Sequence, residues 1–420
     1  MKNMKAAVAG VLGVALLLTG CGGNTSGGGG TDANGKTTIV FDMWAGSQDD
    51  TDAINKQVEI AKKVTGIEIE VRTAPWNDYF TKLTTNMASG NVACVTGMNS
   101  GMLSSYVDAF AELTDEDLAT AGIVKDEFAD GSLEILSNKG KLYGIPFDVS
   151  TMLVYYNKDM LDAAGATEPK AGWTFDDFLA TAKKATTGDK YGFGIALGEF
   201  QWQALPISKS GVQPASKEGV LQLTDPAFVE AATWYSDLVT KEKVAAPVSS
   251  ASDTGWGENQ YSSGAAAMAV DGTWNAVGYL NNDLGFTAGM APLPVGADGS
   301  LGLVLGSGYG ISKTCENKEA ALKVLGGLLN AEAQDYIASS GRSYPARTAS
   351  QPKYFESLDE KYREPVKAAF EEAFKNVQGQ YVTDNWSKVG TFLQPQLVSV
   401  YSGQTSMADI LAEAQKQFGE

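Results

Sequence analysis

Residues 140–161, GKLYGIPFDVSTMLVYYNKDML, constrain the fold more than any other stretch of the chain. A turn at 139–141 leads into a short extended piece, and Pro146 then interrupts any regular ladder because proline lacks a backbone donor. The apolar, β-branched run 149–156 predicts a new strand. Asp148 stands between the two pieces, among apolar neighbours. The stretch therefore predicts a crossing between two sheets, although a simple turn explains a carboxylate there equally well.

Length, charge and composition limit the possible functions. A chain of 420 residues is too long for one ordinary core, so we expect two domains. A net charge of −18 repels phosphate backbones, so we expect no nucleic-acid partner. The chain has no histidine, which excludes Ser-His-Asp and Cys-His catalysis and histidine-ligated zinc. Chemistry that uses carboxylates alone stays open.

The N-terminus has the pattern of a secretion signal. Lys2 and Lys5 precede the apolar run 6–18, which is too short to span a bilayer. The next residues, Leu-Thr-Gly-Cys at 18–21, resemble the lipobox of bacterial lipoproteins; the alternative is an ordinary signal peptide with an incidental cysteine. The resemblance implies removal of residues 1–20 and a lipid anchor, palmitate included, on Cys21. Residues 21–36 are rich in glycine and predict a flexible tether reaching on the order of 20 Å.

Two further cysteines, Cys94 and Cys315, are far apart in the sequence. They could pair, but two lone cysteines give no disulfide framework. We therefore favour two buried free thiols.

The first part of the chain predicts a β-α-β unit. The apolar strand 37–44 is followed by a helix that opens on acidic residues at 49–52, and then by the alternating strand 67–72. Such a unit implies a parallel strand pair, whose ligands lie beyond the carboxyl ends of the strands. Trp44 and Gln48 stand at that position. Asn99 follows the next predicted strand, 92–98, where it is either a ligand contact or a turn residue.

Further candidates come from loops and helix starts in the second half of the chain. We expect a strand over 191–197 that ends in an aromatic loop at 198–203. A glycine-rich strand follows at 303–312, and a helix opens at 384–386. Asp384 there is either a pocket residue or a helix cap. The candidates from these segments are Trp202, Tyr309, Asp384, Asn385 and Trp386. Trp256, which lies upstream of residue 261, is a weaker candidate.

Several motifs together resemble one protein family. The crossing stretch reads G-K-L-Y-G-I-P-F-D at 140–148 and Y-Y-N-K-D at 155–159, and residues 261–274 fit the pattern Y-x-x-G-x-A-A-M-x-V-x-G-x-W. Over residues 37–420 the chain is similar to the family 1 extracellular solute-binding proteins of ABC importers. The family's usual P-D-[VI] strand start is replaced here by Ala93-Cys94-Val95.

The resemblance implies an α/β, two-lobed periplasmic-binding-protein-like fold of type II, with mixed sheets flanked by helices and a hinge between the lobes. It implies one lobe from residues 37–147 and 302–350 and another from 148–301 and 351–420. It also implies a lipoprotein on the outer face of the cytoplasmic membrane that captures a sugar and delivers it to ABC permease subunits. We expect a monomer, with no catalytic residue, cofactor or metal.

The residue types also suit a sugar, whose ring faces are apolar and whose edges carry hydroxyls. The expected stacking platforms are Trp44, Trp202, Trp274 and Trp386. The expected hydroxyl partners are Gln48, Asn99, Asp148 and Asp384.

Two other functions stay open. A polyamine or another non-sugar solute is the first alternative, because Asp148 and Asp384 would suit a cation. A surface glycoside hydrolase that uses these two carboxylates is the second.

Overall fold

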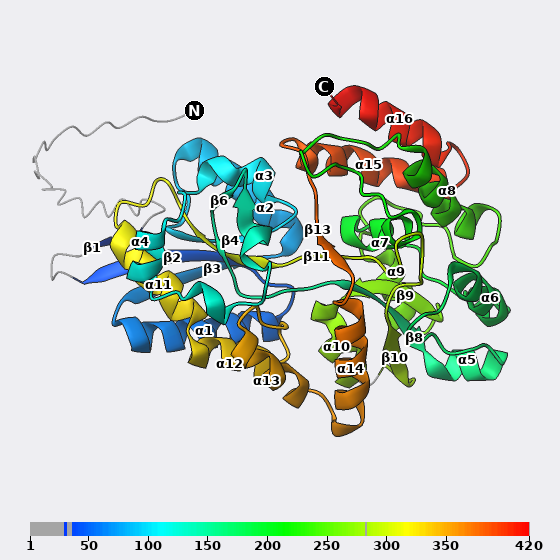
Figure 1. Cartoon of the computed structure of the whole chain (residues 1–420), viewed down its shortest axis with the longest axis horizontal. Coiled ribbons are helices and arrows are strands. Elements are labelled where there is room, and N and C mark those ends of the chain that lie inside the picture. The colour runs from blue at the N-terminus through cyan, green and yellow to red at the C-terminus, as the bar shows by residue number, and fades with distance from the viewer. Residues whose placement is uncertain (1–28, 32–35, 282–283, 420) are drawn as a thin grey trace, which may run out of the picture.

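The computed structural model describes residues 29–31, 36–281 and 284–419. The predicted signal peptide and Cys21 lie outside these residues. Two lobes stand side by side, each with its own sheet and its own hydrophobic core, and several chain segments run between them (Figure 1). The predicted mixed α/β, two-lobed architecture is confirmed, whereas the exact lobe boundaries stay a prediction.

The first lobe is built on a six-stranded mixed sheet of order β1-β2-β4-β12-β7, with β3 on the other side of β2. The predicted β-α-β unit is confirmed, because β2 pairs in parallel with β3. The return strand β12 runs antiparallel to both of its neighbours. The elements that build this lobe are β1 (Gly29–Thr31), β2 (Thr37–Trp44), α1 (Gln48–Thr65), β3 (Glu68–Ala74), α2 (Trp76–Ser89), β4 (Val95–Asn99), α3 (Leu103–Tyr106), α4 (Asp115–Ala121), β5 (Ser137–Asn138), β6 (Lys141–Leu142), β7 (Ile145–Pro146), β12 (Ser307–Ile311), α11 (Lys318–Leu329), α12 (Ala331–Ser339) and α13 (Gln351–Glu356).

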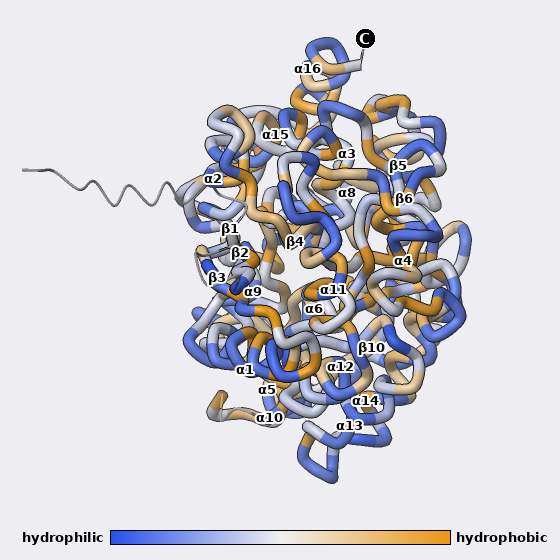
Figure 2. The backbone as a smooth tube through the Cα atoms, turned by 90° about the vertical axis from the view of Figure 1, so that its left-hand side faces the viewer, coloured by the Kyte–Doolittle hydropathy of each residue, from blue (hydrophilic) through white to orange (hydrophobic). Residues whose placement is uncertain are grey.

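Helix α1 shows how local sequence sets these elements. The Ser47 hydroxyl accepts a hydrogen bond from the Asp50 amide at the start of α1, and Gly66 ends the helix with a φ of 68° that suits glycine. Hydrophilic and hydrophobic residues alternate along it (Figure 2), so one face packs against the sheet and α11. The buried Gln57 amide donates to the Leu328 carbonyl at 2.8 Å and ties α1 to α11.

The second lobe is built on an antiparallel sheet of order β10-β8-β9. Strand β8 begins just after the crossing, and the Asn157 side chain caps the helix that follows it. The elements of this lobe are β8 (Met152–Asn157), α5 (Lys158–Ala164), α6 (Phe175–Ala185), α7 (Glu199–Ser210), α8 (Pro226–Thr240), α9 (Trp256–Ser262), β9 (Met268–Gly272), α10 (Ala276–Asn281), β10 (Ala288–Ala291), β11 (Gly302–Val304), α14 (Glu360–Ala373), β13 (Val377–Gly379), α15 (Trp386–Tyr401) and α16 (Met407–Phe418).

The strand predicted over 191–197 is wrong, and so is the loop predicted after it. The segment makes only single parallel bridges, and helix α7 begins at Glu199. Gly192 and Gly194 explain the irregular path, because a Cβ atom there would come within 1.9 Å and 2.4 Å of backbone oxygen atoms. Helix α7 contains Pro206, and because proline is rare inside helices, the sequence pattern did not indicate a helix here.

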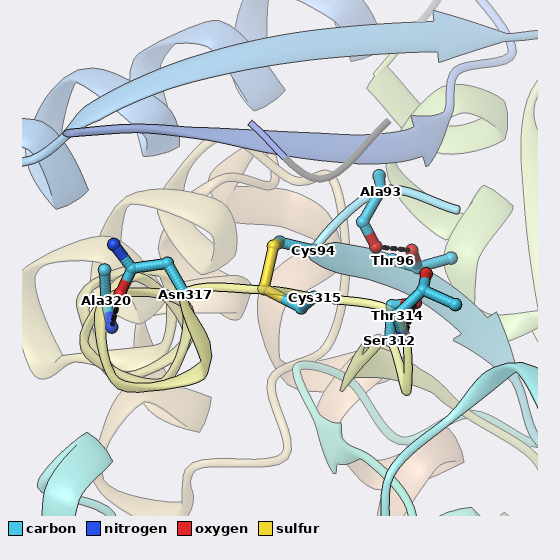
Figure 3. The surroundings of a disulfide bond; sticks show 8 residues. All are labelled: Ala93, Cys94, Thr96, Ser312, Thr314, Cys315, Asn317 and Ala320. Atoms are coloured by element: carbon cyan, nitrogen blue, oxygen red, sulfur yellow. Dashed lines mark hydrogen bonds between the residues drawn. A yellow bond between two sulfur atoms is a disulfide. The ribbon is translucent and has the colours of Figure 1, made fainter. Parts of the chain in front are cut away.

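The two cysteines pair, so the prediction of free thiols is wrong. Cys94 and Cys315 form a disulfide with their Cα atoms 4.8 Å apart, and the bond joins the start of β4 to the segment after β12 (Figure 3). Antiparallel pairing of β4 with β12 brings these two positions together, although 221 positions separate them in the sequence.

Part of the predicted flexible tether forms a strand instead. Gly29–Thr31 form β1, which pairs with the start of β2 in antiparallel register. The sheet of the first lobe therefore begins before residue 36.

Candidate functional site

A cleft of about 1720 Å³ lies between the lobes. Trp44 and Asn99, at the carboxyl ends of β2 and β4, border it from the first lobe, which is where an open α/β sheet binds ligands. Trp274 and Gln201 border it from the second lobe. The cleft is therefore shared by both lobes and lies next to the crossing segments.

Three crossing segments form a continuous hydrogen-bonded hinge beside the cleft. The Phe147 amide donates to the Ser307 carbonyl at 2.8 Å, and the Ser150 amide donates to the Leu305 carbonyl at 2.8 Å. The third segment joins through the Val149 amide, which donates to the Tyr344 carbonyl at 3.0 Å. The backbone groups of these three segments are therefore hydrogen-bonded where the chain passes between the lobes.

Asp148 occupies this hinge and borders the cleft, as its position in the crossing stretch predicts. Its side chain accepts a 2.6 Å hydrogen bond from the Ser307 amide, and the residue is 6 % exposed. Burial raises the pKa of Asp148 to about 7, although the Ser307 amide and the nearby Arg342 oppose the shift. This carboxyl can therefore be neutral or charged near neutral pH.

Aromatic side chains form the wall of the cleft on the first lobe. Trp44 packs edge-on against Trp76 with ring centroids 5.0 Å apart, and Trp76 meets Phe80 at 5.0 Å. Tyr106 continues the row at 5.4 Å from Phe80. All four rings line the cleft, and the row supplies an apolar surface of fixed shape.

A second aromatic pair faces the cleft from the other lobe. Trp274 and Phe200 lie with centroids 6.4 Å apart and line the cleft together. The Trp274 ring folds over Gly272, where a Cβ atom would come within 2.2 Å of it. The G-x-W end of the sequence motif thus has a local steric reason.

Two carboxyl groups of the same lobe are the buried Asp271 and the half-buried Glu258, which lines the cleft. Asp271 accepts hydrogen bonds from the Asn275 amide at 2.6 Å, the Tyr279 hydroxyl at 2.7 Å and the Gln201 amide at 3.2 Å. Burial raises the pKa of Asp271, and burial together with the Asp271 charge raises the pKa of Glu258 to about 8. The hydrogen bonds to Asp271 hold Asn275 and Gln201, which line the cleft from the second lobe.

Four predicted site residues line the cleft: Trp44, Asn99, Asp148 and Trp274. The Asn99 side chain is held in place, since it donates to the Ser307 hydroxyl at 3.3 Å and accepts from the Gly101 amide at 2.9 Å. The sequence analysis therefore located the strand ends and the crossing correctly.

Three other predicted residues lie inside the protein, and a fourth, Trp256, is half-buried outside the cleft lining. Trp202 and Trp386 are 2 % and 1 % exposed in the core of the second lobe, where the Trp386 indole donates to Glu199 at 2.5 Å. Tyr309 is fully buried, and its hydroxyl donates to Gln57 at 3.0 Å. Trp256 packs against the same core as Trp202.

The remaining predicted residues lie beside the cleft. Gln48 is exposed and donates to Asp52 at 2.8 Å. Asp384 pairs with Lys139 at 2.9 Å, which joins the two lobes. Asn385 donates to the carbonyl of Phe418 at 3.2 Å. These residues have structural partners that the sequence pattern did not reveal.

Sequence reasoning missed several residues that line the cleft. The missed set comprises Trp76, Phe80, Tyr106, Phe200, Glu258 and Arg342. Helix spacing gave a signal for Trp76 and Phe80, which lie four residues apart on α2 and so share a face. Arg342 had no comparable signal in the sequence.

Within the part of the chain that the structure describes, no group of acidic or cysteine side chains is arranged to hold a metal ion. No helix among the same residues is both long and apolar enough to cross a membrane.

Comparison with known proteins agrees with the geometry. The family model described as bacterial extracellular solute-binding protein matches residues 44–335. A putative binding protein of Brucella abortus (strain 2308) is 25 % identical over 372 residues, which cover 83 % of this chain and 84 % of that protein. The maltooligosaccharide ABC transporter solute-binding lipoprotein of Streptococcus pneumoniae (TIGR4) is 24 % identical over 430 residues, which cover 96 % and 94 % of the two chains.

A solved structure has the same fold. The ABC substrate-binding protein of Listeria monocytogenes, in complex with cycloalternan, superimposes with a TM-score of 0.81. It is 24 % identical and covers 91 % of this chain and 98 % of its own. At this identity the likeness concerns the fold alone.

Proposed function

Because the chain belongs to the bacterial extracellular solute-binding proteins, we propose that it captures an oligosaccharide or another sugar between its two lobes. The bound form would then dock to a membrane permease. The single observation that carries the proposal is the cleft, which presents aromatic rings from both lobes.

The chemistry of the cleft fits a sugar. Trp44 and Trp76 on one side and Trp274 on the other offer ring faces and edges to the apolar faces of a pyranose. Asn99 and Asp148 lie between them and offer polar atoms to hydroxyls. Aromatic surface with a few fixed polar groups is the combination that binds and orients such a solute.

Closure about the hinge would complete the site. Each lobe carries only part of the aromatic surface, so a solute that touches both parts favours the closed form. On the side of Lys139 and Asp384 the lobes already touch: the Ser104 hydroxyl donates to the Thr383 carbonyl at 2.9 Å. These contacts would add to the stability of the closed form.

The N-terminal pattern supports a location at the outer face of the cytoplasmic membrane. We infer cleavage before Cys21 and acylation of its thiol, since lipid chains hold a protein at a bilayer by about 0.8 kcal/mol for each buried CH₂ group. Labelled palmitate should enter the wild-type protein, and Cys21→Ala should release the protein from the membrane fraction. Retention of the variant on membranes would contradict the anchor.

A binding screen tests the proposed solute. Purified full-length protein would be titrated with neutral oligosaccharides such as maltotriose, lactose and mannobiose, and with polyamines and short peptides. Tryptophan fluorescence and the thermal melting temperature would be followed. A saturable response to one glycan class supports the proposal, and a response only to other solutes contradicts it.

A polyamine is the second candidate, and the charge of the cleft favours it. Six carboxyl side chains line the cleft among the described residues, against the cations Arg342 and Lys388. Burial raises the pKa of three of them, Asp148, Glu199 and Glu258, so Asp49, Asp50 and Asp52 supply most of the negative charge. A saturable response to spermidine without a response to any glycan would establish this alternative.

The same incubations address catalysis. Asp384, one of the two carboxylates considered for a hydrolase, is exposed and paired with Lys139 outside the cleft lining. We therefore expect no glycan product on prolonged incubation. Detection of a product by chromatography would contradict the binding function and support a glycoside hydrolase.

A further inference from the structure

Arg342 is a buried cation at the edge of the cleft. It follows Gly341, which has a φ of 76°, at the end of α12, and its side chain is only 6 % exposed. Its Nε atom lies 3.3 Å from Asp50 Oδ1, and its guanidinium carbon lies 5.2 Å from the ring centroid of Phe147. Arg342, Asp50 and Phe147 all line the cleft.

The guanidinium has hydrogen-bonding capacity that the described residues leave unused. Its Nε and Nη1 atoms are buried, and neither has a hydrogen-bond partner among the described residues, because the approach of Asp50 lacks the geometry of one. A buried donor without a partner costs about 1–3 kcal/mol. A ligand oxygen in the cleft would remove that cost.

A nearby arginine shows what a purely structural role looks like in the same segment. Arg347 lies five positions further on, and its side chain is 14 % exposed. Its Nη1 atom donates to Glu127 Oε2 at 2.8 Å, and the residue lies outside the cleft lining. The Nε atom of Arg347 is also buried without a partner among the described residues, so the difference between the two arginines is the carboxylate bond and the position relative to the cleft. Arg342 has no comparable bond to a carboxylate, although Asp50 lies beside it.

The surrounding charge selects the kind of oxygen that Arg342 can bind. The carboxylates of Asp49, Asp50 and Asp52, all on α1, line the cleft beside Arg342, so an anionic ligand group would meet more negative than positive charge there. Neutral hydroxyls avoid this repulsion. A guanidinium next to a carboxylate also offers donors and an acceptor side by side, which matches two neighbouring hydroxyl groups of one sugar ring.

We propose that Arg342, with Asp50 beside it, is a specificity-determining pair that binds two neighbouring hydroxyl groups of a neutral sugar on the first-lobe side of the cleft. This inference rests on the proposed sugar-binding function. According to this inference, Arg342 and Asp50 contact the solute directly, and the role of Arg342 is not limited to packing on the ring of Phe147.

The test compares Arg342→Met with the matched control Arg347→Met by calorimetric titration. The probe is whichever of maltotriose, lactose or mannobiose binds the wild type. Loss of hydrogen bonds from a charged donor predicts an affinity about 10-fold to 100-fold lower for Arg342→Met. Arg347→Met should bind the probe as the wild type does.

Monodeoxy analogues of the same probe separate contact from packing. Two neighbouring deoxygenations should each weaken binding to the wild type, and neither should weaken binding to Arg342→Met further. If Arg342→Met fails to fold by circular dichroism, Arg342→Lys replaces it. The lysine should also bind more weakly, because a single ammonium group cannot reproduce the planar fork.

Each other outcome overturns the inference. Equal affinity of Arg342→Met and the wild type overturns it and leaves the proposed function intact. Stronger binding of a uronate disaccharide than of the neutral probe, with the preference lost in Arg342→Met, assigns Arg342 to a carboxylate instead. Failure of the wild type to bind any sugar overturns both the proposed function and this inference.

Discussion

Removal of the disulfide should weaken the first lobe strongly and leave solute binding intact. The bond between Cys94 and Cys315 joins the start of β4 to the segment after β12, and Cys94 is fully buried. Asn99, the residue of β4 that borders the cleft, lies at the other end of the strand. The double variant Cys94→Ala/Cys315→Ala therefore changes the chain's covalent constraint without touching the site.

The size of the effect follows from the loop that the bond closes. With 221 positions between the cysteines, loop-closure entropy gives about 5 kcal/mol when the whole chain unfolds. The second lobe lies within this loop, and its folded ends hold Ser150 next to Leu305. If that lobe stays folded while the first one opens, the effective loop has roughly 70 residues and the bond contributes about 4 kcal/mol.

Urea unfolding followed by circular dichroism measures this difference, with the wild type in reductant as the control that keeps both sulfur atoms. The double variant and the reduced wild type should lose similar free energies of unfolding, and titration with the responding sugar should give the wild-type affinity at low denaturant. A loss below about 1 kcal/mol in both samples would refute the entropic reasoning.

Three further predictions concern Asp148, a helix contact and the second-lobe platform. Burial raises the pKa of Asp148 from 3.8 to about 7, so the folded state holds a proton that the unfolded state releases; stability should fall by at most roughly 4 kcal/mol as the pH rises from about 4 to about 7. Asp148→Asn should flatten that slope in pH-dependent thermal melts. Gly326→Ala should destabilise the protein by about 1–3 kcal/mol in urea unfolding, because a Cβ atom would come within 1.7 Å of the Ala121 carbonyl oxygen, whereas Gly278→Ala on α10, with open space around its Cβ position, should not destabilise it. Trp274→Ala should lower the affinity for the responding sugar at least tenfold by calorimetry, and the buried control Trp173→Phe should leave it unchanged; equal affinities would contradict the stacking role.

Local patterns in the sequence determined many individual elements. Alternation and capping placed β2, α1 and β3 within a few residues, because hydrophobic period and cap chemistry act over short stretches. Thr174 and Asp177 form a capping box at the start of α6 through the same short-range chemistry. The crossing at Asp148 was also visible, since Pro146 ends one strand and a β-branched run begins the next.

Only the tertiary structure decided which side chains face the cleft. Trp202 and Trp386 resemble Trp274 in type and in position near element ends, yet both are buried in the second core. Whether these two side chains point into the core or into the cleft depends on how α7 and α15 pack against elements far away in the sequence. No local sequence pattern predicts that packing. The pairing of Cys94 with Cys315 and the position of Arg342 at the edge of the cleft have the same origin. They arise because the sheet and the hinge bring distant segments into contact, which is a property of the folded chain as a whole.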